Sequence, residues 1–591
     1  MRRVMLSEGG SRQGRRRPIA LLAGAIVAVA LLICGIAVAL PSGDGAPDTA
    51  SGPQHPAEFA SAQVTHAHGP AAKAASVPQA VLTIAPSAST TPVPASYFGL
   101  SAEYWALPLF ERDMPVFERV LSLVHVPGNG PLVLRIGGDS ADHSFWMPKK
   151  PRKMPAWEFA VTPTFLSQLR SLVRRDSVKL IVDLNLVTDT PLTAATWADA
   201  AETALPHGSI IGFEVGNEPD IYSHSYWAAT IARSPLEARP LPLELTPDSY
   251  VAKFNTYAQV LAQGAPDVPL IGPAVAHPRV SLGWIKDLIA DDRSELGAVS
   301  GHLYPYSACV KHKTSSSYPT VSRLLSWQAA GGLAKDIESA VTVAHDAGLK
   351  FRLTELNSVT CGGKAGVSNT FATALWAPDA LFTLMRAGVD AVNLHIRAYS
   401  INAPFSLTRR RGLEARPLLY GLIMFARTLG ADARLVRLQM SHVRSVNLSA
   451  WAVRVRGDML HVLVIDKSNR SVRVDLHLPA TGPATVQRLL APSASSTAGE
   501  TLAGQRLGPD GTWIGARLTQ TITAGAHGYV LTVPRRSAAL VGVRIGPKVA
   551  AGATPTHAIT RHRTKVRHRT TAHPGTTVVA ERPGRRGPSR A

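Results

Sequence analysis

Two glutamates in the chain follow apolar runs of strand character. Glu218 comes directly after the stretch IIGFEVGN, and Glu355 ends the run FRLTE. When two carboxyl groups lie close together, their pKa values are pushed apart, so one holds a proton while the other stays ionised. Such a pair can protonate a leaving group and attack an electrophilic carbon. The two glutamates are therefore candidates for a catalytic pair, provided that the fold brings them together.

The sequence around the two glutamates predicts a fold that would bring them together. Between residues 80 and 429, apolar strand-like runs alternate with segments of helical period such as those from Thr164, Ser249 and Phe371. Strands that are apolar on both faces and separated by helices indicate a parallel sheet, and eight such units predict a (β/α)8 barrel. The eight runs begin at Tyr97, Leu132, Lys179, Ile210, Val268, Ala298, Phe351 and Ala391.

Polar residues stand at the ends of these runs. In a (β/α)8 barrel the catalytic groups project from the C-terminal ends of the strands, so these residues are expected to ring one mouth of the barrel. Polar residues at strand ends also form turns and caps, but turn chemistry gives no reason for carboxylates after two separate strands. The residues are Asp139, Asn185, Asn217, Glu218, His302, Tyr304, Glu355 and His395.

Four stretches resemble glycoside hydrolase family 79, the heparanase and β-glucuronidase family of clan A. In chain order they are YFGLSAEYW, LRIGGDSAD, EVGNEPD and LTELNSVTCGGKAGVSNTFATALWAPD. The resemblance covers most of residues 80–545 and implies a retaining glycosidase. Glu218, after the fourth strand, would be the acid/base, and Glu355, after the seventh, the nucleophile. Retaining enzymes hold these two carboxyl groups about 5–5.5 Å apart.

The resemblance also implies roles at the reacting sugar. Asn217 would bind the 2-hydroxyl group, a contact that strengthens in the transition state. Tyr304 would donate to Glu355 and hold it, and His302 is placed beside them as a substrate-site residue. Glu103 and Asp139 match the positions that bind glycone hydroxyls.

Recognition of a uronic acid is expected from the loops after the last two strands. Gly362 and Gly363 are the nearest match to the glycines whose amides receive the sugar carboxylate, since a residue without Cβ lets an anion approach closely. The sequence departs from the animal enzymes here, because Cys361 precedes the glycines and the aromatic is absent. Tyr399 and Arg397 are either additional carboxylate ligands or packing residues. Without uronate recognition the chain would be a β-glycosidase for neutral sugars.

Cys309 and Cys361 follow the sixth and seventh runs, which are neighbours around a barrel. An extracytoplasmic domain would allow a disulfide between them, and two free thiols are the alternative. Neither the number nor the spacing of the cysteines suggests a metal site, and no phosphate loop or dinucleotide fingerprint is present, so no cofactor is expected.

After about Gly430 the helical period stops, and runs that alternate apolar and polar residues predict an antiparallel β-sandwich over residues 430–546. The family resemblance implies that residues 80–96 add a strand to this domain.

The net charge of +21 is concentrated at the two ends of the chain. Residues 1–18 hold six Lys/Arg, and residues 547–591 hold ten. The uncharged run Ile19–Leu40 follows RRRP and is long enough to cross a bilayer as a membrane anchor, or to serve as a signal peptide cleaved after Ala39. Residues 41–79 are expected to be a disordered linker and residues 547–591 a disordered basic tail.

Together these patterns predict an extracytoplasmic enzyme, either anchored in the cell membrane or secreted. Its partners would be a glycoside or oligosaccharide and, through the tail, an anionic polymer; specific nucleic-acid binding is not expected. The leading expectation is cleavage of a β-linked uronic acid. The alternatives are a neutral-sugar β-glycosidase of the same clan and a catalytically silent polysaccharide-binding protein.

Overall fold

The computed structural model describes residues 77–149, 153–176, 178–223, 245–442 and 446–545. The expected anchor or signal peptide, nearly all of the expected linker, and the basic tail lie outside the described residues. Among the helices of the described ranges, none has the length and apolar character needed to span a bilayer.

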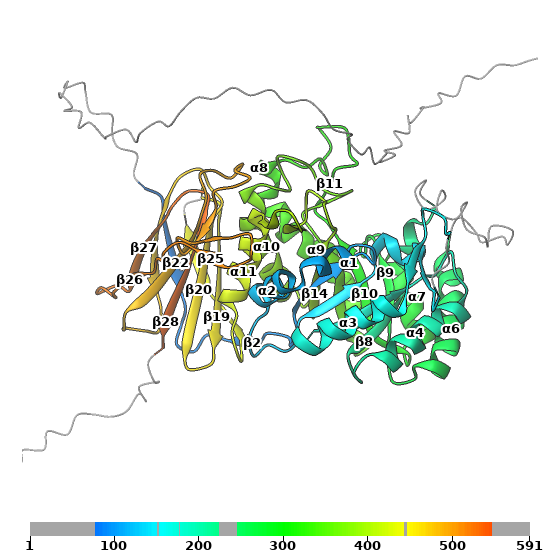
Figure 1. Ribbon diagram of the computed structural model, residues 1–591. Helices are drawn as coiled ribbons and strands as arrows, with labels where there is room; N and C mark the ends of the chain where they lie inside the picture. The colour runs from blue at the N-terminus through cyan, green and yellow to red at the C-terminus, as the bar shows by residue number, and fades with distance from the viewer. Residues whose placement is uncertain (1–76, 150–152, 177, 224–244, 443–445, 546–591) are drawn as a thin grey trace, which may run out of the picture. The chain divides into compact units, whose positions relative to one another are not determined.

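Eight parallel strands close into a barrel, which confirms the predicted fold (Figure 1). Their order around the barrel is β10, β12, β14, β3, β4, β7, β8 and β9, so the seventh strand along the chain pairs with the sixth and the eighth, and the eighth closes on the first. The strands are β3 (Phe98–Ala102), β4 (Val133–Ile136), β7 (Lys179–Leu184), β8 (Ile210–Val215), β9 (Leu270–Val275), β10 (Leu296–Leu303), β12 (Lys350–Leu356) and β14 (Ala391–Ile396).

Helices follow the strands, and their sequences explain where they start. Thr190 and Thr246 cap α4 and α6 through their side chains, and each of these helices has proline in its first turn, where the missing N–H costs nothing. The larger helices are α2 (Met114–Val124), α3 (Pro163–Asp176), α4 (Pro191–Ala204), α6 (Pro247–Gly264), α7 (Leu282–Asp292), α9 (Gly331–Asp346), α10 (Phe371–Arg386) and α11 (Pro417–Thr428). Short strand pairs are formed by β5 (Ser144–Trp146) with β6 (Phe159–Val161), β11 (Tyr306–Ser307) with β13 (Val359–Thr360), and β15 (Phe405–Thr408) with β16 (Gly412–Ala415).

Two further sheets share one apolar core and form the predicted β-sandwich. The first contains β2 (Thr90–Pro92), β17 (Arg434–Val436), β19 (Leu448–Val455), β20 (Met459–Asp466), β28 (Ser537–Arg544), β22 (Ala484–Leu490), β23 (Thr501–Leu502) and β26 (Gln520–Ile522). The second contains β18 (Gln439–His442), β1 (Gln79–Thr83), β21 (Val472–His477) and β27 (Tyr529–Val533). Alternate residues of β27 are buried, as period-two strands require.

The segment before the barrel contributes a strand to each of these sheets. β1 lies between β18 and β21, and β2 pairs with β17. In Figure 1 the blue N-terminal segment runs beside the yellow and orange strands of this domain. The β1–β21 pair is parallel, whereas the sequence predicts a purely antiparallel sandwich. The difference arises because β1 precedes the barrel in the chain, so no hairpin connects it to β21. Two strands next to each other in the chain favour antiparallel pairing, but strands far apart in sequence are free of that constraint.

A buried carboxylate connects the barrel to the sandwich. Asp379 of α10 accepts hydrogen bonds from Trp451 Nε1 and Ser449 Oγ, each at 3.0 Å, and from Lys467 Nζ at 2.7 Å. Both Asp379 and Lys467 have side chains only 5% exposed. Arg386 lies over the ring of Trp451, 4.6 Å from its centroid. The ALWAPD stretch is thus a structural contact between the barrel and the sandwich.

We expect Asp379→Ala to lower the free energy of unfolding by about 3–5 kcal/mol, because Lys467 would be left buried without a counter-charge. Urea unfolding followed by tryptophan fluorescence measures the change. Arg454→Ala, which breaks an exposed ion pair with Asp458, is the matched control and should cost less than about 1 kcal/mol. Equal effects of the two substitutions would contradict the role given to Asp379.

Candidate active site

The barrel brings the two glutamates together. β8 ends at Val215, and Gly216 and Glu218 both have positive φ, 82° and 54°, which turns the chain sharply after the strand. Glu355 is the penultimate residue of β12. One carboxylate oxygen of Glu218 and one of Glu355 lie within 4.8 Å of each other. His302 Nδ1 lies 2.9 Å from Glu218 Oε1 and 3.9 Å from Glu355 Oε2.

Glu355 sits among hydrogen-bond donors and positive charges. The Tyr304 hydroxyl donates to its Oε1, and Arg135 Nη1 donates to its Oε2 at 3.1 Å. His395 Nδ1 lies 3.4 Å from the same Oε2. Burial alone would raise the pKa of Glu355, but His395, His302 and Arg135, together with the Tyr304 hydroxyl, outweigh it and lower the pKa to about 2. The group is therefore ionised at neutral pH, as a nucleophile must be.

Glu218 has a different environment. Its Oε1 lies 2.9 Å from His302 Nδ1, and its side chain is 17% exposed. Among the described residues, neither a guanidinium nor a phenol is hydrogen-bonded to it, in contrast to Glu355. The two carboxyl groups therefore have unequal surroundings, as different roles for them would require.

Arg135 links most of the site and was missed by the sequence analysis. This fully buried side chain donates from Nε to Glu214 at 2.7 Å and from Nη2 to Asp183 at 2.8 Å and to Asn217 Oδ1 at 2.9 Å, besides its bond to Glu355. Burial would lower the pKa of Arg135, but the three carboxylates raise it above its ordinary value. The sequence did offer a signal for this network. Arg135, Asp183 and Glu214 are charged residues that each lie inside an otherwise apolar run.

This network orients Asn217. Because its amide oxygen accepts from Arg135, the amide NH2 group points the other way and is presented as a donor. The side chain is nearly inaccessible in the absence of substrate, at 1% exposure for the residue. The arrangement fits a donor to a sugar hydroxyl.

A second acidic group lies on the other side of His395. His395 Nε2 is 3.7 Å from Glu103 Oε1, and Ser140 N donates to Glu103 Oε2 at 2.9 Å. Burial would raise the pKa of Glu103, but His395 and Arg397 lower it. Burial and the negative charge of Glu103 raise the pKa of Asp139 above its usual range. The negative charges of Glu218 and Glu355 also raise the pKa of Asp139.

The loops after β12 and β14 hold the other predicted residues. Cys309 and Cys361 form a disulfide, which ties the loop after β10 to the loop after β12. Gly362 and Gly363 follow with φ of 74° and 88°, and the Gly363 N–H donates to Thr360 O at 3.1 Å. Tyr399, with φ of 65°, is 56% exposed. Among the backbone hydrogen bonds of the described residues, the Gly363 N–H therefore has an acceptor, whereas the Gly362 N–H has none.

Asn185 proves to be structural. Its amide group bonds to Thr188 and to the carbonyl of Ser144, so it closes a turn after β7 and does not join the catalytic group.

The clustering of Glu218, His302 and Glu355 also meets the distance requirement for a shared metal ion. The donors already present disfavour that assignment. Both oxygens of Glu355 accept hydrogen bonds, and the Arg135 guanidinium stands 3.1 Å from one of them, where it would repel a second cation. The three side chains fit acid–base chemistry better than metal coordination.

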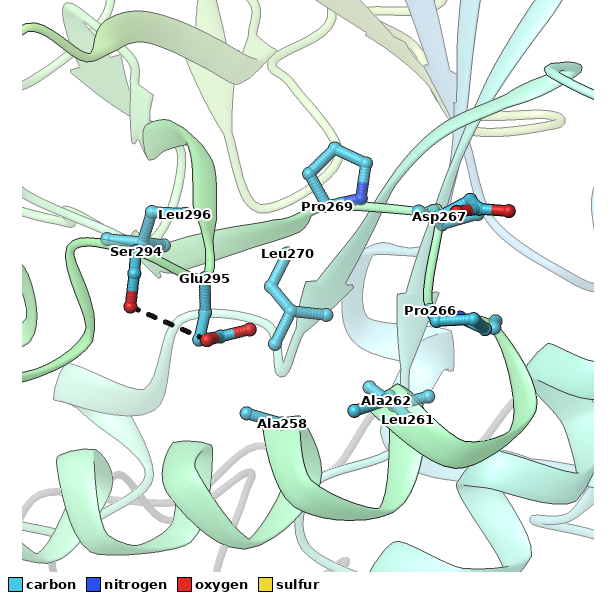
Figure 2. Close-up of a pocket in the computed structure, with 12 residues that line it drawn as sticks. Ala258, Leu261, Ala262, Pro266, Asp267, Pro269, Leu270, Ser294, Glu295 and Leu296 are labelled. Atoms are coloured by element: carbon cyan, nitrogen blue, oxygen red, sulfur yellow. Dashed lines mark hydrogen bonds between the residues drawn. The ribbon is translucent and has the colours of Figure 1, made fainter.

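A cavity of about 230 Å³ lies between α6 and the first residues of β9 and β10. Figure 2 draws the side chains that line it. Leu261, Pro269 and Glu295 are among its lining residues. It lies at the N-terminal end of the barrel strands, opposite the carboxylates. That end of a (β/α)8 barrel usually serves stability, so the cavity is not a candidate for the active site.

Comparison with known proteins adds the following. No family model matches the chain. A β-glucuronidase from Aspergillus niger is 24% identical over 484 residues, which cover 71% of this chain and 84% of that protein. A β-glucuronidase from Neurospora crassa is 26% identical over 365 residues, which cover 54% of this chain and 61% of that protein.

Solved structures share the fold. The crystal structure of a 4-O-α-L-rhamnosyl-β-D-glucuronidase from Fusarium oxysporum superposes with a TM-score of 0.64 at 17% identity and covers 78% of this chain and 99% of that one. A family 51 α-L-arabinofuranosidase from Bifidobacterium longum superposes with a TM-score of 0.57 at 14% identity, covering 79% of this chain and all of that one.

Proposed function

We propose that this protein is a glycoside hydrolase that cleaves β-linked uronic acids, with net retention, from glycans or glycoconjugates. The observation that carries the proposal is the approach of the Glu218 and Glu355 carboxylates to within 4.8 Å at the C-terminal mouth of the barrel. Retaining glycosidases hold their carboxyl groups about 5–5.5 Å apart, whereas inverting ones leave about 6.5–9.5 Å for a water.

In this mechanism Glu218 protonates the oxygen of the leaving group while Glu355 attacks the anomeric carbon and forms a glycosyl–enzyme bond. The deprotonated Glu218 then takes a proton from water, which attacks the same carbon and releases the sugar with Glu355 restored as a carboxylate. Tyr304 and Arg135 hold the nucleophile, and Asn217 donates to the 2-hydroxyl group.

The uronic acid specificity is supported by the two fungal relatives, which are named β-glucuronidases, and by the motifs that resemble family 79. One observation favours the alternative of a β-glycosidase for neutral sugars. The Gly363 amide, one of two expected to receive the sugar carboxylate, is already used by Thr360.

The test is hydrolysis of 4-nitrophenyl β-D-glucuronide and of the matching β-D-glucoside, with proton NMR of the first sugar released. We expect preference for the glucuronide and initial appearance of the β-anomer. Glucoside preference would favour the neutral-sugar enzyme, and an initial α-anomer would refute retention. Oligosaccharide binding without any turnover would favour the silent binding protein.

We also propose that the catalytic domain works outside the cytoplasm. The Cys309–Cys361 disulfide supports this, because such bonds persist in oxidising compartments. Anchoring through Ile19–Leu40 and binding of anionic polymer by the basic tail remain part of the proposal and rest on the sequence alone.

A further inference from the structure

An anionic sugar faces an electrostatic difficulty at this site. Four carboxyl groups, those of Glu103, Asp139, Glu218 and Glu355, surround the place where the glycone would bind, and each that is ionised repels a uronate. Recognition of a uronic acid therefore requires a positive or strongly polar group that can reach its carboxylate.

The glycine loop offers one neutral donor. The Gly363 N–H is engaged by Thr360 O at 3.1 Å, which leaves the Gly362 N–H without an acceptor among the backbone bonds of the described residues, and the Gly362 carbonyl accepts from Ile401 N at 3.2 Å. Arg135 is no better placed, because it is fully buried beneath Asn217 and already bonded to its acceptors.

Arg397, just after β14, has the right charge and accessibility. Its side chain is 36% exposed, and it lies over the ring of Trp105 at 5.8 Å from the centroid. Arg397 Nη1 is 3.4 Å from Asp139 Oδ2, and Nε is 3.7 Å from Glu103 Oε1. The contact with Asp139 is a hydrogen bond donated by Arg397.

The position of Arg397 relative to the chemistry follows from its neighbours. Glu103 lies between Arg397 and His395, and His395 contacts the nucleophile Glu355. Asp139 is close enough to feel the charge of both catalytic glutamates. Arg397 is therefore separated from Glu355 by the side chains of Glu103 and His395.

We propose that Arg397 determines the specificity for uronic acids by binding the sugar carboxylate through its guanidinium group in exchange for Asp139. This rests on the proposed function. A guanidinium can bind a carboxylate through two parallel hydrogen bonds, and Trp105 supports its outer face. Asp139, with a third of its side chain exposed, can turn toward solvent or toward a sugar hydroxyl when it is displaced. Glu103 is 1% exposed and stays to orient the arginine.

The experiment compares wild type, Arg397→Gln and Arg397→Lys on the 4-nitrophenyl β-D-glucuronide and β-D-glucoside. Arg397→Gln is expected to lower kcat/KM for the glucuronide about 10- to 100-fold, mainly through KM, since a lost charge-assisted hydrogen bond has this magnitude. Its kcat/KM for the glucoside should change less than about threefold or rise. Arg397→Lys should recover part of the glucuronide activity, because it restores the charge without the paired geometry.

Arg456→Gln is the matched control. It breaks an arginine–aspartate pair on the sandwich surface, with Asp432, and should leave both substrates unaffected. An equal loss for both substrates in Arg397→Gln would overturn the proposal, since a merely structural role moves both. An unchanged preference for the glucuronide would overturn it as well.

Binding of free D-glucuronate and D-glucose, measured by calorimetry, separates this inference from the enzyme proposal. If the wild type binds glucuronate and Arg397→Gln does not, Arg397 binds the sugar carboxylate. This conclusion holds even if the protein turns over no glucuronide. If the wild type turns over the glucuronide and Arg397→Gln binds glucuronate as tightly as wild type, the inference fails while the proposed function stands. If the wild type neither binds glucuronate nor turns over the glucuronide, both fail.

Discussion

Replacing Glu355 with glutamine is expected to lower kcat on any accepted glycoside by roughly 10⁴- to 10⁶-fold, the magnitude typical of losing a catalytic nucleophile. Glutamine has nearly the same shape: its amide oxygen can still accept from Arg135, and its NH2 group can donate to the Tyr304 hydroxyl oxygen, so the pocket is kept. What is lost is the negative charge that the low pKa of Glu355 guarantees at neutral pH. No glycosyl–enzyme bond can then form.

The measurement is single-turnover and steady-state hydrolysis of the preferred 4-nitrophenyl glycoside, with the melting temperature as a check on folding. Glu414→Gln, at an exposed position of β16, is the matched control and should keep full activity. A fall in kcat of less than about tenfold in a folded Glu355→Gln protein would remove Glu355 as the nucleophile.

Glu218→Gln provides an internal comparison. Because Glu218 is assigned to protonate the leaving group, its loss should matter less for 4-nitrophenol, which leaves without help, than for an alcohol aglycone. Glu355→Gln should affect both aglycones alike. The two glutamates are thus distinguishable by leaving-group dependence, and identical dependence in both variants would contradict the assigned roles.

The barrel and its two glutamates were predictable because each rests on a local pattern. Apolar runs at the spacing of βα units give the strands, and the fold rule that strand ends carry the chemistry selects Glu218 and Glu355. The roles of Tyr304 and Asn217 came from the family motifs. The structure places both in contact with the network that the two glutamates belong to.

Arg135 could not be predicted in the same way. It lies within β4, and a charged side chain in an otherwise apolar run gives no indication of what it binds. Its partners Asp183, Glu214 and Glu355 follow 48, 79 and 220 residues later, on three other strands. These charges come together because the barrel closes. No local periodicity of the sequence indicates that they will. The same limit applies to the parallel β1–β21 pair, which depends on a contact between the two ends of the folded region.

Arg135→Gln is accordingly expected to have the largest effect on stability in the barrel. Asp183 and Glu214 would be left in the fully buried interior without their counter-charge, and breaking a buried ion pair in this way costs about 3–5 kcal/mol. Activity should fall as well, because Asn217 and Glu355 lose the donor that orients them. The free energy of unfolding from urea titration and kcat/KM of the folded protein are the two measurements.

A second substitution separates the two effects of losing Arg135. Adding Glu214→Gln removes one of the stranded carboxylates, and the amide still accepts from Thr354, which bonds to Glu214 Oε1 at 2.8 Å in the wild type. The double variant should regain part of the stability, since one uncompensated buried charge is gone. It should not regain activity, because Asn217 and Glu355 remain without the guanidinium. Recovery of activity together with stability would show that Arg135 serves the fold alone and has no part in holding the catalytic groups.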